Sequence, residues 1–154
     1  MIDHQLATHQ TIHKSIRLDA PLNEVWEALT QPELMKSWMS DSEIEIVTTW
    51  EGGSPMFIHV QEVSYKTAFT NTGIVLQFVK ERILEYSHLS SISRLPDEAE
   101  NYTIIRFTLQ REEDHTLLEL SLSNFPTESH YKHFDFYWTV ALDVLKRFVE
   151  ERHQ

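Results

Sequence analysis

The chain has 154 residues, the length of one ordinary domain, and 41% of them are hydrophobic, including 4 Trp, 5 Tyr and 8 Phe. Its 13 Lys and Arg oppose 24 Asp and Glu, and the net charge of −11 disfavours binding to nucleic acid or to anionic membrane surfaces. The absence of cysteine excludes a disulfide framework, a thiolate metal site and a thiol nucleophile.

Targeting and membrane signals are missing from the sequence. No apolar run approaches the roughly 20 residues of a membrane-spanning helix, and the chain begins with MIDHQLATHQTIHKS, which has no apolar signal-peptide core. No linker, repeat or low-complexity segment divides the chain. We therefore expect a single domain over residues 1–154, with a core of about 10–152, in a cytoplasmic protein.

The N-terminal part predicts one strand followed by two short helices. Residues 8–18 alternate as a strand does. Pro21 fits the first turn of a helix, where its missing N–H costs nothing, and apolar residues then recur at helical spacing from Leu22 to Leu29. Pro32 opens a second helix. Helices this short are unstable alone, so both must pack on a larger surface. The second helix is expected to carry Leu34, Met35, Trp38 and Met39.

The middle of the chain predicts strands. In the last hairpin, alternation places three apolar side chains of each strand on one face and polar side chains on the other, as in an antiparallel sheet with one wet face. The segment 65–71 is ambiguous. The predicted strands are 42–50, 54–64, 72–79, 82–91, 102–110 and 115–123. The inward residues of the last two are Ile105, Phe107, Leu109, Leu118, Leu120 and Leu122.

The chain ends in a long predicted helix. Thr127 is a credible N-cap, and neither Gly nor Pro interrupts the chain from there to about Arg152, so the helix would be roughly 39 Å long. Its broad apolar sector favours a helix clasped by other elements. The sector consists of Phe134, Trp138, Ala141, Leu145 and Phe148, widened by Tyr137, Val140 and Val144. The predicted class is therefore α+β, with a curved antiparallel sheet of about six or seven strands around this helix and two short helices after the first strand.

Three segments carry a resemblance to a known family. The segment APLNEVWEALTQPELMKSWM is similar to a pattern of Ala-Pro, Val-Trp, Ala-Leu-Thr, Pro-Glu and Trp, WEGGSPMFI to a Gly-Gly turn entering a strand, and FYWTVALDVLKRFVEE to a tryptophan-led C-terminal helix. Together they resemble the START-like or SRPBCC superfamily, of which the birch pollen allergen is an example, and within it the branch of activator of heat-shock protein 90 ATPase homologues. The likeness covers about residues 10–152 and implies the helix-grip fold.

The resemblance implies more than one kind of function. Many members of the superfamily bind small apolar or amphipathic molecules between the sheet and the long helix, and a few branches are aromatic cyclases or dehydratases. Eukaryotic co-chaperones of this branch carry an additional N-terminal domain, for which we expect no room here. The family often has glycine before the helix tryptophan. Tyr137 stands there in this chain, and its phenol would narrow a cavity or place a hydroxyl in it.

Two histidines near the start of the long helix raise the question of a metal site. His130 and His133 lie three residues apart, with Asp135 close behind, and this spacing can bring side chains together on a helix. A metal site needs a third converging ligand, and the sequence shows none. We interpret these residues as a solvated first turn and expect neither a metal nor a cofactor.

Other polar residues are candidates for a place in a cavity. Lys14 shares a strand face with apolar residues, so it would either pair with an acidic ligand or run its stem along apolar surface with its ammonium in water. His59 is expected to face outward. Tyr86 and His88 share a strand face and form either a hydrogen-bonded pair in a cavity, suited to acid–base chemistry, or ordinary rim residues.

The favoured function is non-enzymatic binding of a small apolar or amphipathic ligand in a cavity between sheet and C-terminal helix. One alternative is a chaperone-related or other interaction module, as a monomer or homodimer, which an exposed patch at Met35, Trp38 and Met39 would support. Another is a cyclase- or hydrolase-like enzyme, which requires polar cavity residues with perturbed pKa values. The expected cavity lining consists of Trp38, Phe57, Phe78, Tyr86, His88, Phe107, Phe134, Tyr137 and Trp138.

Overall fold

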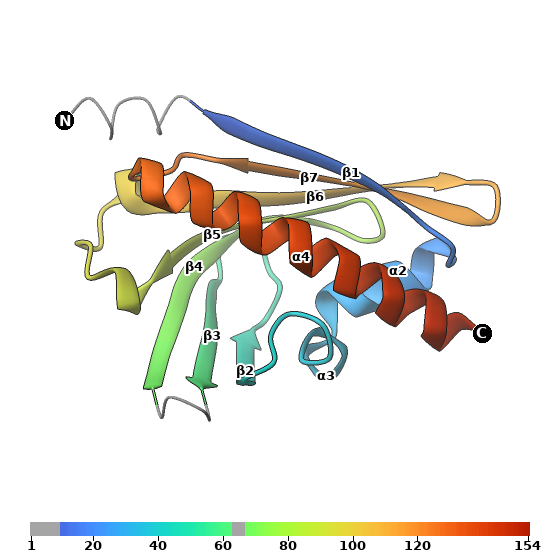
Figure 1. The fold of residues 1–154 in the computed structure, drawn as a ribbon, viewed down its shortest axis with the longest axis horizontal. Coiled ribbons are helices and arrows are strands. Elements are labelled where there is room, and N and C mark those ends of the chain that lie inside the picture. The colour runs from blue at the N-terminus through green and yellow to red at the C-terminus, as the bar shows by residue number, and fades with distance from the viewer. Residues whose placement is uncertain (1–9, 63–66) are drawn as a thin grey trace.

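The computed structural model of the protein describes residues 10–62 and 67–154. The predicted order of one strand, two short helices, a run of strands and a long helix is confirmed (Figure 1). Predicted strand residues 8–9 and 63–64 lie outside the described residues, as do 65–66 of the ambiguous segment, whose remainder belongs to β4. The elements are β1 (Thr11–Leu18), α2 (Leu22–Thr30), α3 (Pro32–Met35), β2 (Glu43–Thr48), β3 (Pro55–Glu62), β4 (Thr67–Val79), β5 (Ile83–Ser90), the short 3-10 helices η1 (Ser91–Ser93) and η2 (Ala99–Asn101), β6 (Thr103–Glu112), β7 (His115–Ser123) and α4 (Glu128–His153).

The seven strands of the described chain form one antiparallel sheet in the order β1-β7-β6-β5-β4-β3-β2. From β2 onward each strand pairs with the next one in sequence, whereas β1 pairs with β7, so that Thr11 lies opposite Ser123. Figure 1 shows α4 lying across one face of this sheet, while β2, β3 and β4 turn away from the direction of β6 and β7. The sheet is therefore curved around the helix, as the helix-grip fold requires.

The core lies between the sheet and α4. All six residues predicted to face inward from β6 and β7 are buried, which confirms the alternation predicted for this hairpin. The buried face of α4 differs from the predicted apolar sector, because one predicted residue is exposed and two others are buried. Val140 is 48% exposed, whereas Leu142 and Val149 are buried. At 100° per residue, position 140 lies about 200° from Trp138 and therefore faces away from the sheet.

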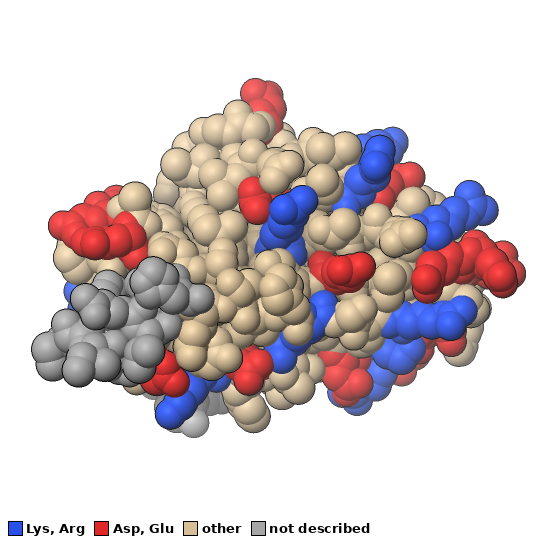
Figure 2. All heavy atoms as spheres, turned by 90° about the horizontal axis from the view of Figure 1, so that it is seen from above, with Lys and Arg blue, Asp and Glu red and all other residues tan. Residues whose placement is uncertain are grey.

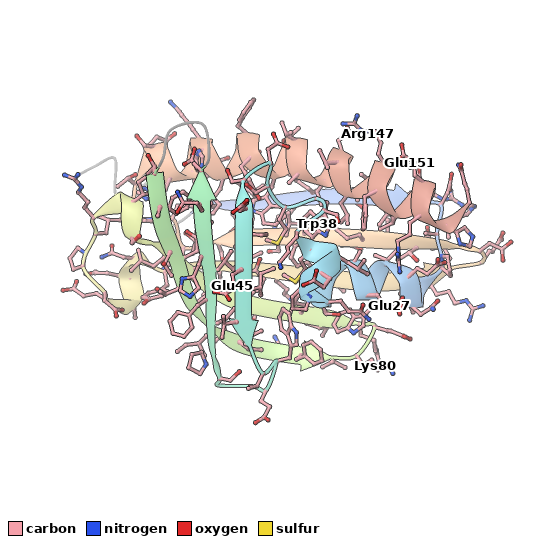
Figure 3. All side chains as sticks on the ribbon, turned by 90° about the horizontal axis from the view of Figure 1, so that it is seen from below. Glu27, Trp38, Glu45, Lys80, Arg147 and Glu151 are labelled. Atoms are coloured by element: carbon pink, nitrogen blue, oxygen red, sulfur yellow. The ribbon has the colours of Figure 1, made fainter. Side chains whose placement is uncertain are left out.

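The two short helices are held together by an indole hydrogen bond. Trp38 lies inside the molecule beside α3, whereas the labelled Glu45 and Lys80 lie at its surface (Figure 3). An α-helix would pair the carbonyl of Ala28 with the N–H of residue 32, but Pro32 has no N–H. Trp38 Nε1 donates to this carbonyl instead, at 2.8 Å. The second helix is shorter than predicted, since it ends at Met35 and the tryptophan lies in the turn that follows.

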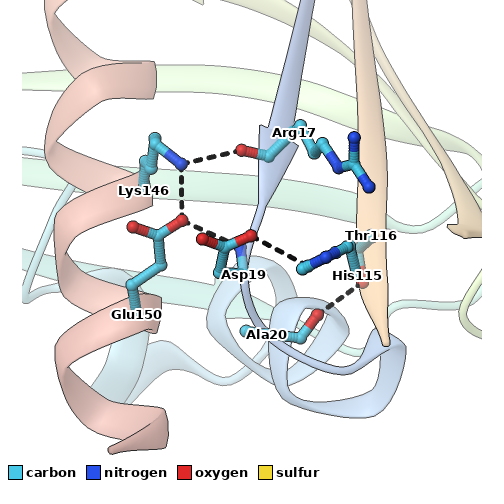
Figure 4. A network of polar contacts seen from close by, with 7 residues as sticks. All are labelled: Arg17, Asp19, Ala20, His115, Thr116, Lys146 and Glu150. Atoms are coloured by element: carbon cyan, nitrogen blue, oxygen red, sulfur yellow. Dashed lines mark hydrogen bonds and ion pairs between the residues drawn. The ribbon is translucent and has the colours of Figure 1, made fainter. Parts of the chain in front are cut away.

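The C-terminal half of α4 is fastened to the end of β1 (Figure 4). Lys146 Nζ donates to the carbonyl of Arg17 at 2.9 Å and pairs with Glu150, which accepts a 2.8 Å hydrogen bond from the Asp19 backbone N–H. Asp19 also pairs with His115 at 2.8 Å. Although burial alone would raise it, the pKa of Glu150 is lowered by the hydrogen bonds from Lys146 and Asp19. Figure 2 shows acidic and basic side chains mixed at the end of the molecule that carries the C-terminus.

One glycine permits a close approach of two strands. A Cβ on Gly73 in β4 would lie 1.7 Å from the backbone oxygen of Ser87 in β5. The Ser87 hydroxyl accepts a hydrogen bond from the N–H of Ile74, and the β4–β5 register shifts between Val75 and Gln77. Gly73 therefore lies within a strand, beside an irregularity, where only a residue without a side chain fits.

Candidate functional site

A cavity of about 500 Å³ lies between the first half of α4 and the part of the sheet formed by β2 to β6. Its walls are mostly apolar. Ile44, Ile58 and Ile105 contribute from the sheet, and Phe134 and Trp138 contribute from the helix. The volume falls within the range of about 300–1,000 Å³ typical of small-molecule sites.

The cavity is open beside the first turns of α4. Ile92 of η1 lines it and is 57% exposed, and His133 of α4 also lines it and is exposed. Ser129, on the turn of the helix before His133, is exposed in the same way. These exposed lining residues show that the cavity opens to solvent between η1 and the helix.

The structure places five of the nine residues expected to line a cavity along this one. Tyr86 and His88 contribute from β5, and Phe134, Tyr137 and Trp138 contribute from successive turns of α4. The two β5 residues are two positions apart and therefore share one face of the strand, and the helix residues follow i, i+3 and i+4 spacing. These are the positions at which a helix lying over a sheet directs its side chains toward it.

Phe57 and Phe78 were expected in the lining but lie elsewhere. Strand alternation directs Phe57 outward, and Phe78 belongs to a separate cluster of aromatic side chains. Phe57 is 36% exposed on the outer face of β3, where its ring stacks on that of His59 with the centroids 6.2 Å apart. The outward position expected for His59 thus applies to Phe57 as well. Phe78 packs between Trp26 at 5.2 Å and Trp50 at 5.5 Å, away from the cavity. Both expectations were wrong.

Trp38 and Phe107 are also not part of the lining, although both contact a residue that is. Their rings lie 6.2 Å and 5.5 Å from that of Trp138, and both side chains are buried. Trp38 is held by its hydrogen bond to the α2 backbone, and Phe107 fills the core below Trp138. They support the wall of the cavity from behind, which corrects the expectation that they face it.

His88 is held in its neutral form. Burial is the main cause that lowers its pKa to about 4, and repulsion from the neighbouring His130 and His133 contributes to the same shift. The ring contacts Phe134 edge-on at 5.3 Å. Its Nδ1 is buried and has no hydrogen-bond partner in residues 10–62 and 67–154.

The two cavity tyrosines also stay uncharged. Burial raises the pKa of Tyr86, and Tyr137 raises it further. Burial raises the pKa of Tyr137 to about 12. The Tyr137 hydroxyl donates to the backbone oxygen of Met39, which ties the helix to the segment after α3. Tyr137 therefore both lines the cavity and joins the helix to Met39, another lining residue.

The histidine pair of α4 contacts the helix N-cap and the cavity rather than a cluster of further His, Asp or Glu side chains in the described chain. His130 Nδ1 lies 2.7 Å from the N-cap hydroxyl of Thr127, and within the described residues no group of three or more His, Cys, Asp or Glu could hold a metal ion. Asp135 lies instead 2.7 Å from the ammonium of Lys14. His130 and His133 line the cavity, a role that the sequence interpretation missed.

Lys14 does not reach the cavity. Its ammonium donates to Asp135 at 2.7 Å and to the hydroxyl of Thr139 at 2.9 Å, so it joins β1 to the outer side of α4. This lysine therefore has neither of its two expected roles. Its ammonium is not a charge for an acidic ligand, and it is not left in water.

Helical spacing could have placed some of the missed lining residues on the cavity face, whereas no sequence pattern indicated the others. His130 and His133 precede Phe134, Tyr137 and Trp138 at helical spacing, so they could have been placed on the same face. Asn71 also lines the cavity. It falls in the segment that the sequence left ambiguous, and no periodicity there indicated which way its side chain points.

The sequence was compared with families and solved structures. A family model described as activator of Hsp90 ATPase homolog 1-like protein matches residues 19–150. The chain belongs to this family. The protein ChR145 from Cytophaga hutchinsonii is 32% identical over 94% of this chain and 97% of its own, with a TM-score of 0.78. No curated protein matches the sequence.

Two further structures of the same fold extend the comparison. CalU16 from Micromonospora echinospora is 27% identical over 90% of this chain and 75% of its own, with a TM-score of 0.68. The Aha1 dimer from Colwellia psychrerythraea is 22% identical over 92% of this chain and 96% of its own, with a TM-score of 0.70, and shares the fold. Within the described residues, none of the helices is long and apolar enough to cross a membrane.

Proposed function

We propose that this Hsp90-activator-like protein is a cytoplasmic, non-enzymatic binder of a small apolar or amphipathic molecule. The observation that carries the proposal is the cavity of about 500 Å³, which is mostly apolar and opens beside the start of α4. Apolar side chains provide most of its surface, and polar side chains converge on it from different elements, which is the usual composition of a small-molecule site. His88, Tyr86 and Tyr137 are all kept uncharged, so the interior favours apolar guests.

A ligand screen with a cavity-filling variant tests this function. Fatty acids, sterols, aromatic polyketides and flavonoids are screened by thermal shift, and hits are measured by calorimetry. A ligand at a hundred times its Kd should add about 2.7 kcal/mol to the free energy of unfolding. Ile58→Phe fills the cavity from β3 and should abolish binding, whereas Ile74→Phe, on the outer face of β4, should leave it unchanged. A panel without any hit, or equal binding by both variants, would contradict the proposal.

An acid–base enzyme is a second candidate, because Tyr86 and His88 both line the cavity and both have shifted pKa values. The directions of the shifts weaken it. A general acid or base works best with a pKa near the operating pH, and here the histidine moves down to about 4 while the tyrosine moves up from 10.0. Loss of turnover in Tyr86→Phe and His88→Gln, in any reaction found for the protein, would establish this function over simple binding.

An interaction module has less support at the surface where it was expected. Met35, Trp38 and Met39 are buried, so they form no exposed patch. Exposed apolar side chains occur instead on the outer face of the sheet, where Val47 lies opposite Phe57. This face is a candidate contact for a homodimer or for a chaperone. Sedimentation of the wild type and Phe57→Ser distinguishes a dimer through this face from a monomer.

A further inference from the structure

Three buried polar atoms of residues that line the cavity have no hydrogen-bond partner among the residues that the structure describes. They are Asn71 Oδ1 from β4, His88 Nδ1 from β5 and Trp138 Nε1 from α4. Buried polar groups are nearly always hydrogen-bonded, and leaving one unpaired costs about 1–3 kcal/mol. Three such atoms in one lining mark a place where a guest with polar groups gains hydrogen bonds.

These atoms set conditions on the polar end of that guest. The indole Nε1–H of Trp138 can only donate, so the guest needs an acceptor such as a carbonyl or hydroxyl oxygen. Neutral His88 accepts or donates at Nδ1 according to its tautomer, and the Asn71 amide offers both kinds of group. Asn71 pairs with Ser90, two residues beyond His88 on the same strand, so the β4 and β5 groups are close neighbours. A hydroxyl or carbonyl group satisfies this combination.

The charges around the cavity disfavour an ion of either sign. No Lys or Arg occurs among the described lining residues, and Glu62 is the only permanently ionisable carboxyl side chain among them. Lys14, the lysine that the sequence had suggested for the cavity, donates instead to Asp135 and Thr139 on the outer side of the helix. Burial lowers the pKa of the lining residues His88 and His130, so both are neutral at pH 7.5. A buried anion would therefore meet neither a lysine nor an arginine, at a large desolvation cost. A cation could approach Glu62 but offers no acceptor to Trp138.

We propose that the cavity selects an uncharged apolar molecule with a hydroxyl or carbonyl group, and that Trp138 Nε1–H donates to the oxygen of that group. This inference rests on the proposed binding function and specifies its ligand class. Asn71 and His88 complete the polar contacts, and the surrounding isoleucines and Phe134 enclose the apolar part. Fatty-acid anions and amines of the same size are rejected.

Naphthalene derivatives that differ in one group test the selectivity. Binding of 2-naphthol, 2-acetylnaphthalene, 2-naphthoate and 2-naphthylmethylammonium is measured by calorimetry at pH 7.5, and the set decanol, 2-decanone, decanoate and decylammonium repeats the test on a flexible chain. The uncharged members of either set should bind at least tenfold more tightly than the charged ones. A preference for the carboxylate or the ammonium would overturn the inference and leave the binding function standing. If no member of either set binds, both fail.

A matched pair of tryptophan variants tests the donor. Trp138→Phe should weaken binding of the uncharged ligands about tenfold, whereas Trp26→Phe should not, because Trp26 is buried beside Phe78, outside the lining. In the wild type, the Trp138 indole N–H resonance should shift and exchange more slowly with solvent when 2-acetylnaphthalene is added, a readout that needs no variant at that position. Unchanged affinity in Trp138→Phe, or an unmoved indole resonance at saturation, would overturn the assignment of the donor.

Discussion

Two buried tryptophans, 6.2 Å apart, differ in the state of their indole N–H groups, and the difference is measurable as stability. Trp38 and Trp138 are 4% and 2% exposed. The first donates to the Ala28 carbonyl at 2.8 Å, whereas the second has no acceptor in the described part of the chain. Changing each to phenylalanine removes a similar volume from the same region of the core. The packing loss is thus of the same kind in both variants, and the hydrogen bond is the main difference.

The magnitude follows from what each variant leaves behind. In Trp38→Phe the carbonyl of Ala28 loses its donor, and Pro32 cannot replace it, so a buried acceptor stays unpaired at a cost of about 1–3 kcal/mol. Trp138→Phe removes an unpaired donor and breaks no hydrogen bond within the protein. We therefore expect Trp38→Phe to be the less stable variant by about 1–3 kcal/mol in the absence of ligand.

Urea unfolding followed by far-ultraviolet circular dichroism measures the difference, because that signal does not depend on the tryptophan removed. Equal slopes with denaturant concentration show that the two variants unfold to the same extent. If Trp138→Phe is as unstable as Trp38→Phe or less stable, the Trp138 N–H is already well bonded in the empty protein. The argument for a polar guest at that atom would then lose its physical basis.

Three further changes have defined outcomes. Because burial lowers the folded pKa of His88 from 6.5 to about 4, the unfolded state takes up the proton first as pH falls. This group should therefore remove about 2 kcal/mol of stability between pH 7 and pH 5, a loss that urea titrations should find smaller in His88→Gln. Gly73→Ala places a methyl group 1.7 Å from a backbone oxygen, so this severe overpacking should lower the unfolding free energy by about 3 kcal/mol or more. Gly52→Ala, which has open space around it, should leave the unfolding free energy unchanged. Thr127→Ala removes the hydroxyl that caps α4 and should lower the melting temperature through a loss of about 1 kcal/mol, which Thr127→Ser should restore.

The fold could be predicted because its periodicities are local. Period-2 alternation in β6 and β7 and helical spacing in α4 each decide which side chains face inward, and the observed burial agrees with most of them. The pair Pro21 and Pro32 marked the short helices through the special geometry of proline. These signals depend on neighbours in sequence, which is why one chain sufficed to find them.

The site was less predictable because it depends on where separate elements meet. Alternation assigned Phe57 to the same face as His59, yet nothing local showed that Phe78 would meet Trp26 rather than the cavity. Lys14 found a partner 121 residues away. Such distances in sequence carry no periodic signal, so a candidate lining could be proposed only as a set of aromatic residues.

The position of the hollow follows from how the short helices support α4. Helix α2 lies under its C-terminal half, where it contacts α4, β6 and β7, and Leu142, Leu145 and Val149 are buried there. Under the N-terminal half β2 to β4 turn away from the direction of β6 and β7, and the cavity lies there (Figure 1). Trp138 stands at the boundary: its ring packs on Trp38 on the filled side and lines the cavity on the other. Trp138 therefore belongs to both the packed core and the cavity wall, so a substitution there should change both the stability of the fold and the proposed ligand binding.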